Sequence, residues 1–176
     1  RAMLYGSYKK PRELIWIIGM LIFLVLMAEG FAGYLLPWGQ MSYWGAQVII
    51  SLFGAIPGVG EALVEFIRGD YSISDITLNR FFALHVIVLP LALIGLIFVH
   101  IVALHHVGSN NPDGIEIKKN KGPDGVPVDG VAFHPYHTSK DLVAIVVFLM
   151  IFTSVVFFAP EMGGYFLEHA NFEPAN

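Results

Sequence analysis

The sequence predicts an all-α membrane protein: a transmembrane bundle of three spanning helices plus an amphipathic helical hairpin on the membrane surface. Of its 176 residues, 56% are hydrophobic and only 14% are charged, whereas soluble domains average about 25% charged residues. Three apolar stretches reach the roughly 20 residues that a helix needs to cross a bilayer. Because lipid offers backbone groups no hydrogen-bonding partner, we expect these stretches to be helical.

The elements follow from local patterns along the chain. The hairpin is predicted between the first two spans, where apolar runs are cut at Ile56-Pro57-Gly58. A polar stretch rich in Gly, Asn, Asp and Lys predicts a solvent loop before the third span. The expected segments are a cytoplasmic-side segment 1–13, a transmembrane helix 14–36, an outer-side surface helical hairpin 37–78, a transmembrane helix 79–105, a cytoplasmic-side loop 106–138, a transmembrane helix 139–160 and an outer-side tail 161–176.

Composition excludes several functions. The chain has no cysteine, which rules out disulfides, iron–sulfur ligation by thiolates and cysteine nucleophiles, so any metal must be held by His, carboxylate or Met. A net charge of -4 with an apolar composition argues against nucleic-acid binding. The opening "RAMLYGSYKKPR" has no signal pattern and no initiator Met, from which we expect a fragment or a processed piece.

Charge predicts the orientation in the membrane. Eight of the ten Lys and Arg residues fall in the N-terminal segment and on the side of the 107–138 loop, and only Arg68 and Arg80 fall on the opposite side. The positive-inside rule therefore places the N-terminal segment and the loop in the cytoplasm.

Two histidines interrupt the second span, "FFALHVIVLPLALIGLIFVHIVALHH". An ionisable residue inside a span indicates a functional site by default. His85 and His100 are fifteen residues apart, which in a regular helix is roughly 22 Å along the axis and about 60° around it. One imidazole near each membrane face suits two stacked metal cofactors, and haem iron accepts axial His.

Two other interpretations of these histidines stay open. Each could be a core residue that bonds a neighbouring helix, or the pair could form a proton relay, although this helix contains no carboxylate. Pro90 lies between them and removes one backbone hydrogen bond, so a kink or bulge is expected to change the angular offset. In the first span, Gly19 and Gly33 are fourteen residues apart and lie on one face, where they favour close approach of a flat group or of another helix.

Four stretches together carry a resemblance to a known family: "GYLLPWGQMSYWGA", "RFFALH", "HIVALHHVGSNNPDG" and "FHPYHTSKD". They closely resemble cytochrome b of the cytochrome bc complex, respiratory complex III, and the resemblance covers essentially the whole chain. It implies a central fragment of an eight-helix protein that holds two b-type haems, with His85 and His100 as iron ligands. Their second axial ligands would come from upstream sequence. Many family members space these ligands by fourteen residues rather than fifteen.

The resemblance also implies residues around the haems. Arg80 would pair with a propionate of the outer haem, and Arg80 suits that role as a permanent cation at the membrane edge. Ser7, Trp16 and Arg1 would meet propionates of the inner haem. A snorkelling interfacial Arg is the alternative for Arg80.

A quinol-oxidising pocket is implied at the outer end of the first span. The resemblance assigns an aromatic wall to Phe31 and Tyr34, and assigns the hairpin side to Met41, Gly45 and Ile49. Gly39 and Gly45 are expected to permit backbone turns and close approach.

Glu29 is a carboxylate that we expect to be buried, one turn before Gly33, where many relatives have a neutral residue. We expect Glu29 to bond a neighbouring helix or to take part in proton handling near the quinol-oxidising pocket.

A quinone-reducing site is implied on the cytoplasmic side. His105 ends the second span, and Lys140 and Asp141 open the third. His, Lys and Asp around one pocket can bind the two carbonyls of a quinone and deliver its protons. For Asp141, a carboxylate favoured by the helix dipole is the alternative.

The implied function is that of the haem-binding membrane subunit of quinol:cytochrome c reductase, an enzyme that couples electron transfer from ubiquinol to proton translocation. The implied partners are cytochrome c1-type and Rieske iron-sulfur subunits in a homodimeric complex in the bacterial inner membrane. The isolated piece is expected to be inactive and to bind no haem stably. A structural membrane subunit and a small bis-His electron carrier are the rival functions.

Overall fold

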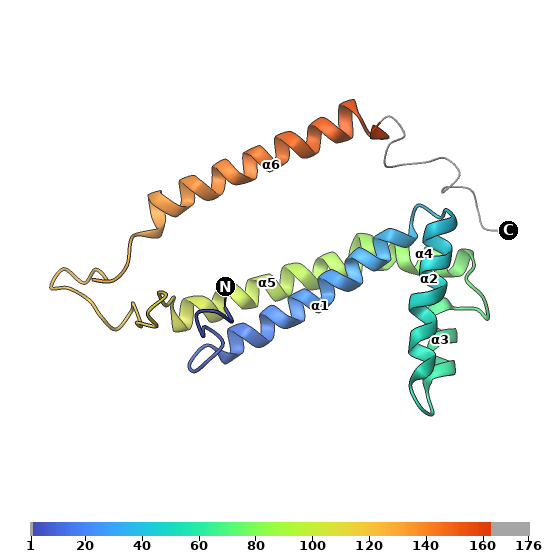
Figure 1. The fold of residues 1–176 in the computed structure, drawn as a ribbon, viewed down its shortest axis with the longest axis horizontal. Coiled ribbons are helices and arrows are strands. Elements are labelled where there is room, and N and C mark those ends of the chain that lie inside the picture. Colours follow the sequence, from blue (N-terminus) through green and yellow to red (C-terminus); the bar gives the residue numbers. More distant parts are fainter. Residues whose placement is uncertain (1, 163–176) are drawn as a thin grey trace. The chain divides into compact units, whose positions relative to one another are not determined.

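The computed structural model describes residues 2–162, and their regular structure is helical (Figure 1). Two isolated β-bridges occur in the loop after α5, and no strand is present in residues 2–162. The all-α fold class is confirmed. The elements are α1 (Glu13–Leu35), α2 (Gln40–Leu52), η1 (Phe53–Ala55), α3 (Gly60–Arg68), α4 (Asp75–Ala83), η2 (Leu84–Val88), α5 (Leu89–Val107), η3 (Phe133–His137) and α6 (Thr138–Phe158).

Within residues 2–162, three helices are long and apolar enough to cross a membrane, as predicted. They are α1, the continuous helix Asp75–Val107 made of α4, η2 and α5, and the helix Phe133–Phe158. Large hydrophobic side chains are exposed along all three, and those of α6 are exposed all round. A helix that is apolar on every side is stable only among lipids or other apolar helices. The chain is therefore a multi-pass membrane protein.

The described residues form two compact units. The first contains residues 2–19 and 98–162, and in it the start of α1 lies beside the end of α5. Buried Ile18 and Ala103 contribute to its apolar interior. The buried Arg12 ties the N-terminal segment to the loop, because its Nε donates to the carbonyl oxygen of Gly108 at 3.0 Å.

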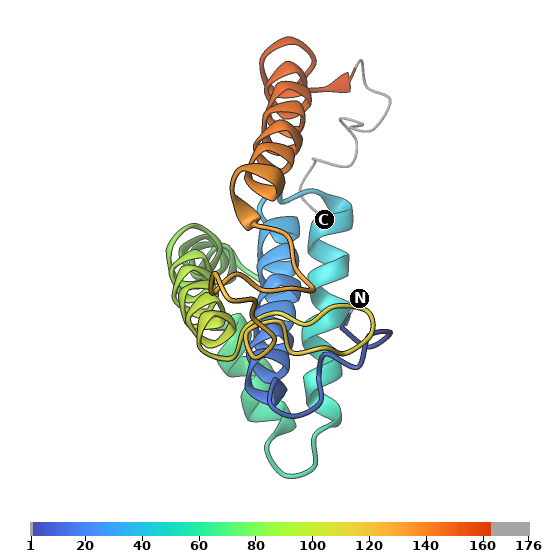
Figure 2. The same cartoon turned by 90° about the vertical axis from the view of Figure 1, so that its left-hand side faces the viewer.

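The second unit contains residues 20–97 and holds the larger core. Here the end of α1 lies beside the start of the Asp75–Val107 helix, and the hairpin of α2 and α3 runs steeply away from them (Figures 1 and 2). The core buries side chains from α1, α2, the segment before α4, and α4. Its buried residues are Ala32, Leu35, Ala46, Ile50, Ile73 and Phe81.

The turn between α1 and α2 places its unusual backbone conformation beside the expected glycine. Gly39 itself has an extended backbone (φ -89°), which any residue can adopt. Trp38 takes the left-handed conformation instead, with φ 56°. Its ring packs edge-on against Tyr43 with centroids 6.2 Å apart. We attribute the tolerance of this unfavourable backbone conformation to that packing.

Candidate functional site

His85 lies against Gly33, where the second half of α1 passes the start of the long helix. A Cβ atom built on Gly33 would lie 2.6 Å from Cε1 of His85 and 3.0 Å from its Nδ1. Cβ atoms do not approach other atoms so closely, so any side chain at residue 33 would displace the imidazole. The lack of a side chain at Gly33 is what lets the two helices hold this ring between them.

His100 and Gly19 repeat the arrangement in the other unit. A Cβ atom on Gly19 would lie 3.3 Å from Cε1 of His100, which is a tight contact but a less severe one. The Nδ1 atom of His100 is buried and has no hydrogen-bond partner among the described residues. A buried ring nitrogen without a partner is unfavourable unless something else occupies it. The two predicted iron ligands thus each face one of the two predicted small residues.

A π-helical turn reconciles the two spacings. The histidines are fifteen residues apart and the glycines fourteen, which in regular helices would put the pairs about 100° out of register. His85 lies in the π-helical turn η2. At the end of this turn, the N–H of Leu89 donates to the carbonyl of Leu84, five residues earlier. A π-turn accommodates one residue more than an α-turn. The extra residue is absorbed before Pro90, so both histidines meet their glycines.

Glu29 is the polar partner of His85. Its carboxylate Oε1 and its own backbone carbonyl oxygen each lie 3.1 Å from Nδ1 of His85. The expectation that Glu29 bonds a neighbouring helix therefore agrees with the structure. The sequence signal for this contact was the carboxylate itself inside a span, one turn before Gly33.

Of the residues predicted for the quinol-oxidising pocket, Tyr34 and Gly45 lie close to each other. Phe31 packs edge-on against Phe81 with ring centroids 5.4 Å apart. Tyr34 reaches α2, because a Cβ on Gly45 would lie 3.3 Å from Cε1 of Tyr34. The side chains of Met41 and Ile49 are exposed on the same helix α2.

The side chain of Arg80 contacts the hairpin through Phe66 of α3. Its Nη1 donates to the carbonyl oxygen of Phe66 at 2.5 Å, and its guanidinium lies 6.0 Å from the centre of the Phe66 ring. The side chain is exposed. Pairing of Arg80 with an anionic group would therefore compete with this contact between the last turn of α4 and α3.

Two of the residues predicted around the inner haem, Ser7 and Trp16, contact other residues of the first unit. Ser7 donates through Oγ to Oδ1 of Asn110 at 3.0 Å, which joins the N-terminal segment to the loop. Trp16 is half-buried and its ring is tilted against Tyr8, with centroids 5.9 Å apart. Arg1 lies outside the described residues.

The residues predicted for quinone reduction are all exposed: His105, Lys140 and Asp141. No hydrogen bond or ion pair joins His105 to Lys140 or Asp141 within residues 2–162. Lys118 instead donates through Nζ to the carbonyl oxygen of His105, and its charge suits the C-terminal end of α5.

The loop carries one resolved electrostatic effect. Lys119 Nζ lies 2.5 Å from Oε2 of Glu116. The hydrogen bond from Lys119 lowers the pKa of the Glu116 carboxyl below its ordinary value.

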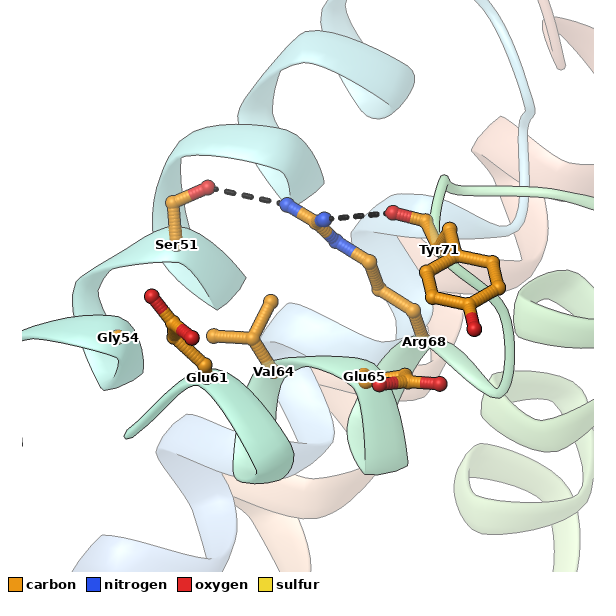
Figure 3. Close-up of a pocket in the computed structure, with 7 residues that line it drawn as sticks. All are labelled: Ser51, Gly54, Glu61, Val64, Glu65, Arg68 and Tyr71. Atoms are coloured by element: carbon orange, nitrogen blue, oxygen red, sulfur yellow. Dashed lines mark hydrogen bonds between the residues drawn. The ribbon is translucent and has the colours of Figure 1, made fainter. Parts of the chain in front are cut away.

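Arg68 forms a polar contact that the sequence pattern did not predict. Within the hairpin, it donates through Nη1 to the carbonyl of Tyr71 at 3.0 Å and through Nη2 to Oγ of Ser51 at 3.1 Å (Figure 3). It thereby joins the end of α3 to α2 and borders a surface cavity of about 440 Å³. The cavity is lined by Ser51, Gly54, Glu61, Val64, Glu65, Arg68 and Tyr71. A lone cation on an otherwise acidic hairpin was the only sequence signal.

Comparison with known proteins is consistent with this architecture. The profile of the family described as "Cytochrome b(N-terminal)/b6/petB" matches residues 1–164. Cytochrome b of Allochromatium vinosum is 65% identical over 180 aligned positions, which cover all of this chain and 43% of that protein. Cytochrome b of Rickettsia prowazekii is 51% identical over 176 positions and is covered to 42%.

The fold is also similar to that of a solved structure, described as "Hyperthermophilic respiratory Complex III". The superposition has a TM-score of 0.76 and 40% sequence identity, and it covers 99% of this chain and 45% of the chain in that structure. The fold defines a multi-pass helical membrane protein with histidines aligned along one spanning helix. The chain belongs to the cytochrome b family, and it spans less than half the length of the relatives named above.

Proposed function

We propose that the chain is the haem-carrying and quinone-binding part of the membrane subunit of a quinol:cytochrome c reductase. The observation that carries the proposal is the pairing of His85 with Gly33 and of His100 with Gly19 at two levels between the same two helices. One such pair would fit simple helix packing. Two pairs kept in register by a π-turn fit two cofactors stacked across the membrane.

The residues present fit haem at each level. Each level offers one imidazole, and no group of three or more His, Asp or Glu gathers in residues 2–162 to hold a bare metal ion. Nδ1 of His100 is buried and has no hydrogen-bond partner among the described residues, which favours a ligand beside this ring. When bound, two b-type haems supply a one-electron relay between the membrane faces.

In this proposal His85 would hold the haem nearer the outer face and His100 the haem nearer the inner face. Gly19 and Gly33 would let the macrocycles approach α1. Arg80 on the outer side, and Ser7, Trp16 and Arg1 on the inner side, would hold the propionates.

The outer pocket oxidises quinol. Phe31 and Tyr34 shape its aromatic wall, and Met41, Gly45 and Ile49 line the hairpin side. The close approach of Tyr34 to Gly45 supports this assignment, because it joins the end of α1 to α2 at the predicted place.

The inner pocket reduces quinone. His105, Lys140 and Asp141 bind its carbonyls and deliver two protons from the side that carries most of the basic residues. Ubiquinone is the proposed substrate at both pockets, and release of protons outside with uptake inside translocates charge.

The proposed setting is a homodimeric complex with cytochrome c1-type and Rieske iron-sulfur subunits in the bacterial inner membrane. The positive-inside rule supports a cytoplasmic position for residues 107–138.

The test replaces the histidines in the intact complex. His85→Leu and His100→Leu are each expected to halve the b-type haem measured by a pyridine haemochrome spectrum and to abolish inhibitor-sensitive quinol oxidation. His106→Leu is the matched control, because His106 is exposed at the end of the same helix, and it should keep both haems. Full haem content in the His85 and His100 variants would refute the proposal.

A further inference from the structure

Glu29 stands out because it is a carboxylate inside a membrane-spanning helix. It lies on α1, and its side chain is only 19% exposed. Placing an acidic side chain in a membrane is costly unless it has a partner. Its partner is the ring of His85, whose Nδ1 lies 3.1 Å from Oε1.

The chemistry of the contact defines where the ring hydrogen lies. The backbone carbonyl oxygen of Glu29 can only accept a hydrogen bond. Nδ1 of His85 must therefore carry the hydrogen in order to bond this oxygen at 3.1 Å, and Oε1 of the Glu29 side chain lies at the same distance from Nδ1. This leaves Nε2 unprotonated and available to a metal.

In the described part of the chain, the Glu29 side chain makes no hydrogen bond or ion pair other than its contact with His85. Its second oxygen, Oε2, is buried and has no hydrogen-bond partner, and no Lys or Arg of residues 2–162 forms an ion pair with it. The side chain of Glu29 is therefore directed at His85. The backbone carbonyl alone would suffice to orient the ring, so the side chain adds a second oxygen to a contact that already exists.

We infer that Glu29 is a positioning residue that tunes the outer haem through its ligand His85. The carboxylate draws the Nδ1 hydrogen toward itself and raises the electron density at Nε2. A more basic imidazole stabilises oxidised iron over reduced iron. Glu29 therefore lowers the reduction potential of the outer haem, and it leaves the inner haem, whose ligand His100 has no such partner, unaffected.

The experiment compares Glu29→Gln and Glu29→Ala in the intact, haem-loaded complex. Redox titration followed at the haem absorption bands is expected to show a higher midpoint potential for the outer haem in both variants, with the larger shift in Glu29→Ala. The inner haem should keep its potential. Haem content should stay at the level of the parent protein, because the backbone carbonyl still holds the ring. The low-spin ferric EPR signal of the outer haem alone should move.

Gly30→Ala is the matched control on the same helix. A Cβ at Gly30 meets nothing within 4 Å, so both potentials should stay unchanged. An unchanged outer-haem potential and EPR signal in both Glu29 variants would overturn the inference.

The inference rests on the proposed ligation of a haem by His85, and the two can fail separately. If His85→Leu retains both haems, the proposed function fails. If His85→Leu loses one haem while the Glu29 variants match the parent protein, only the role of Glu29 fails.

Discussion

The two histidine levels share one architecture and differ in how each ring is held. At the outer level, the ring of His85 has two oxygen acceptors at Nδ1, both from Glu29, and crowds Gly33. At the inner level, Nδ1 of His100 is buried without a partner in residues 2–162, and the ring has a looser contact with Gly19.

The difference traces to one position of α1. Glu29 precedes Gly33 by four residues, and the residue four before Gly19 is Ile15. In this helix, Gly19 and Gly33 are fourteen residues apart, and so are Ile15 and Glu29, which each lie four residues before one of these glycines. A carboxylate stands at one level and an apolar side chain at the other. The helices supply the same geometry twice, and a single side chain makes the two sites chemically unequal.

The largest expected effect comes from breaking the register between the two helices. Deleting Leu24, an exposed residue between the two glycines, rotates one glycine by about 100° relative to the other. Because α1 is a regular helix there, it has no π-turn to absorb the change. We expect the complex to lose one of the two proposed haems, measured by pyridine haemochrome.

Deleting Ile87 is the matched comparison. Ile87 is also exposed and lies in η2, so its loss converts the π-turn into an α-turn and leaves the histidines fourteen residues apart. Both haems should be retained. Loss of a haem in this variant as well would show that the π-turn does more than absorb a residue.

A smaller effect is expected from filling the space over each glycine. Gly33→Ala would place a Cβ 2.6 Å from the His85 ring, whereas Gly19→Ala would place one 3.3 Å from His100. Overpacking of the first kind costs about 1–3 kcal/mol, and the second contact needs a shift of only a few tenths of an ångström. Haem retention on mild heating should fall more in Gly33→Ala. Equal losses would mean that the two levels are equally tight.

The inequality of the levels can also be tested by supplying the missing acceptor. Ile15→Gln places an amide oxygen one turn before Gly19, where it can accept a hydrogen bond from Nδ1 of His100. Such a bond contributes about 0.5–1.5 kcal/mol. The inner haem should become harder to reduce in a redox titration, while the outer haem keeps its potential. A shift of the outer haem alone would argue against this geometry.

The smallest effect is expected in the loop. The Lys119 ammonium lowers the pKa of the Glu116 carboxyl, so the stability that this pair contributes is present above the ordinary Glu pKa and is lost as the pH falls through the lowered value. The Glu116 side chain is partly exposed and that of Lys119 is largely exposed, so the pair is screened by water. Lys119→Ala should change the rate of limited proteolysis of the loop by less than about twofold at neutral pH. A larger change would mean that this ion pair stabilises the loop more than a solvent-exposed pair ordinarily does.

Much of the fold follows from local pattern. The three spans were predictable because a bilayer demands long apolar helices. The histidines and glycines were predictable because ionisable and small residues inside such helices are rare and have few uses. The position of the strained turn was not predictable, because residue type alone does not show which neighbour adopts it, and here it is Trp38.

By itself the sequence determined which helices cross the membrane, that two imidazoles lie at different depths along one of them, and the family to which the chain belongs. Only the tertiary structure decided that the histidines face the glycines, because that depends on a π-turn whose extra residue does not alter the apolar pattern. It also decided that Glu29 meets His85, since contacts between residues 56 positions apart arise from how two helices pack.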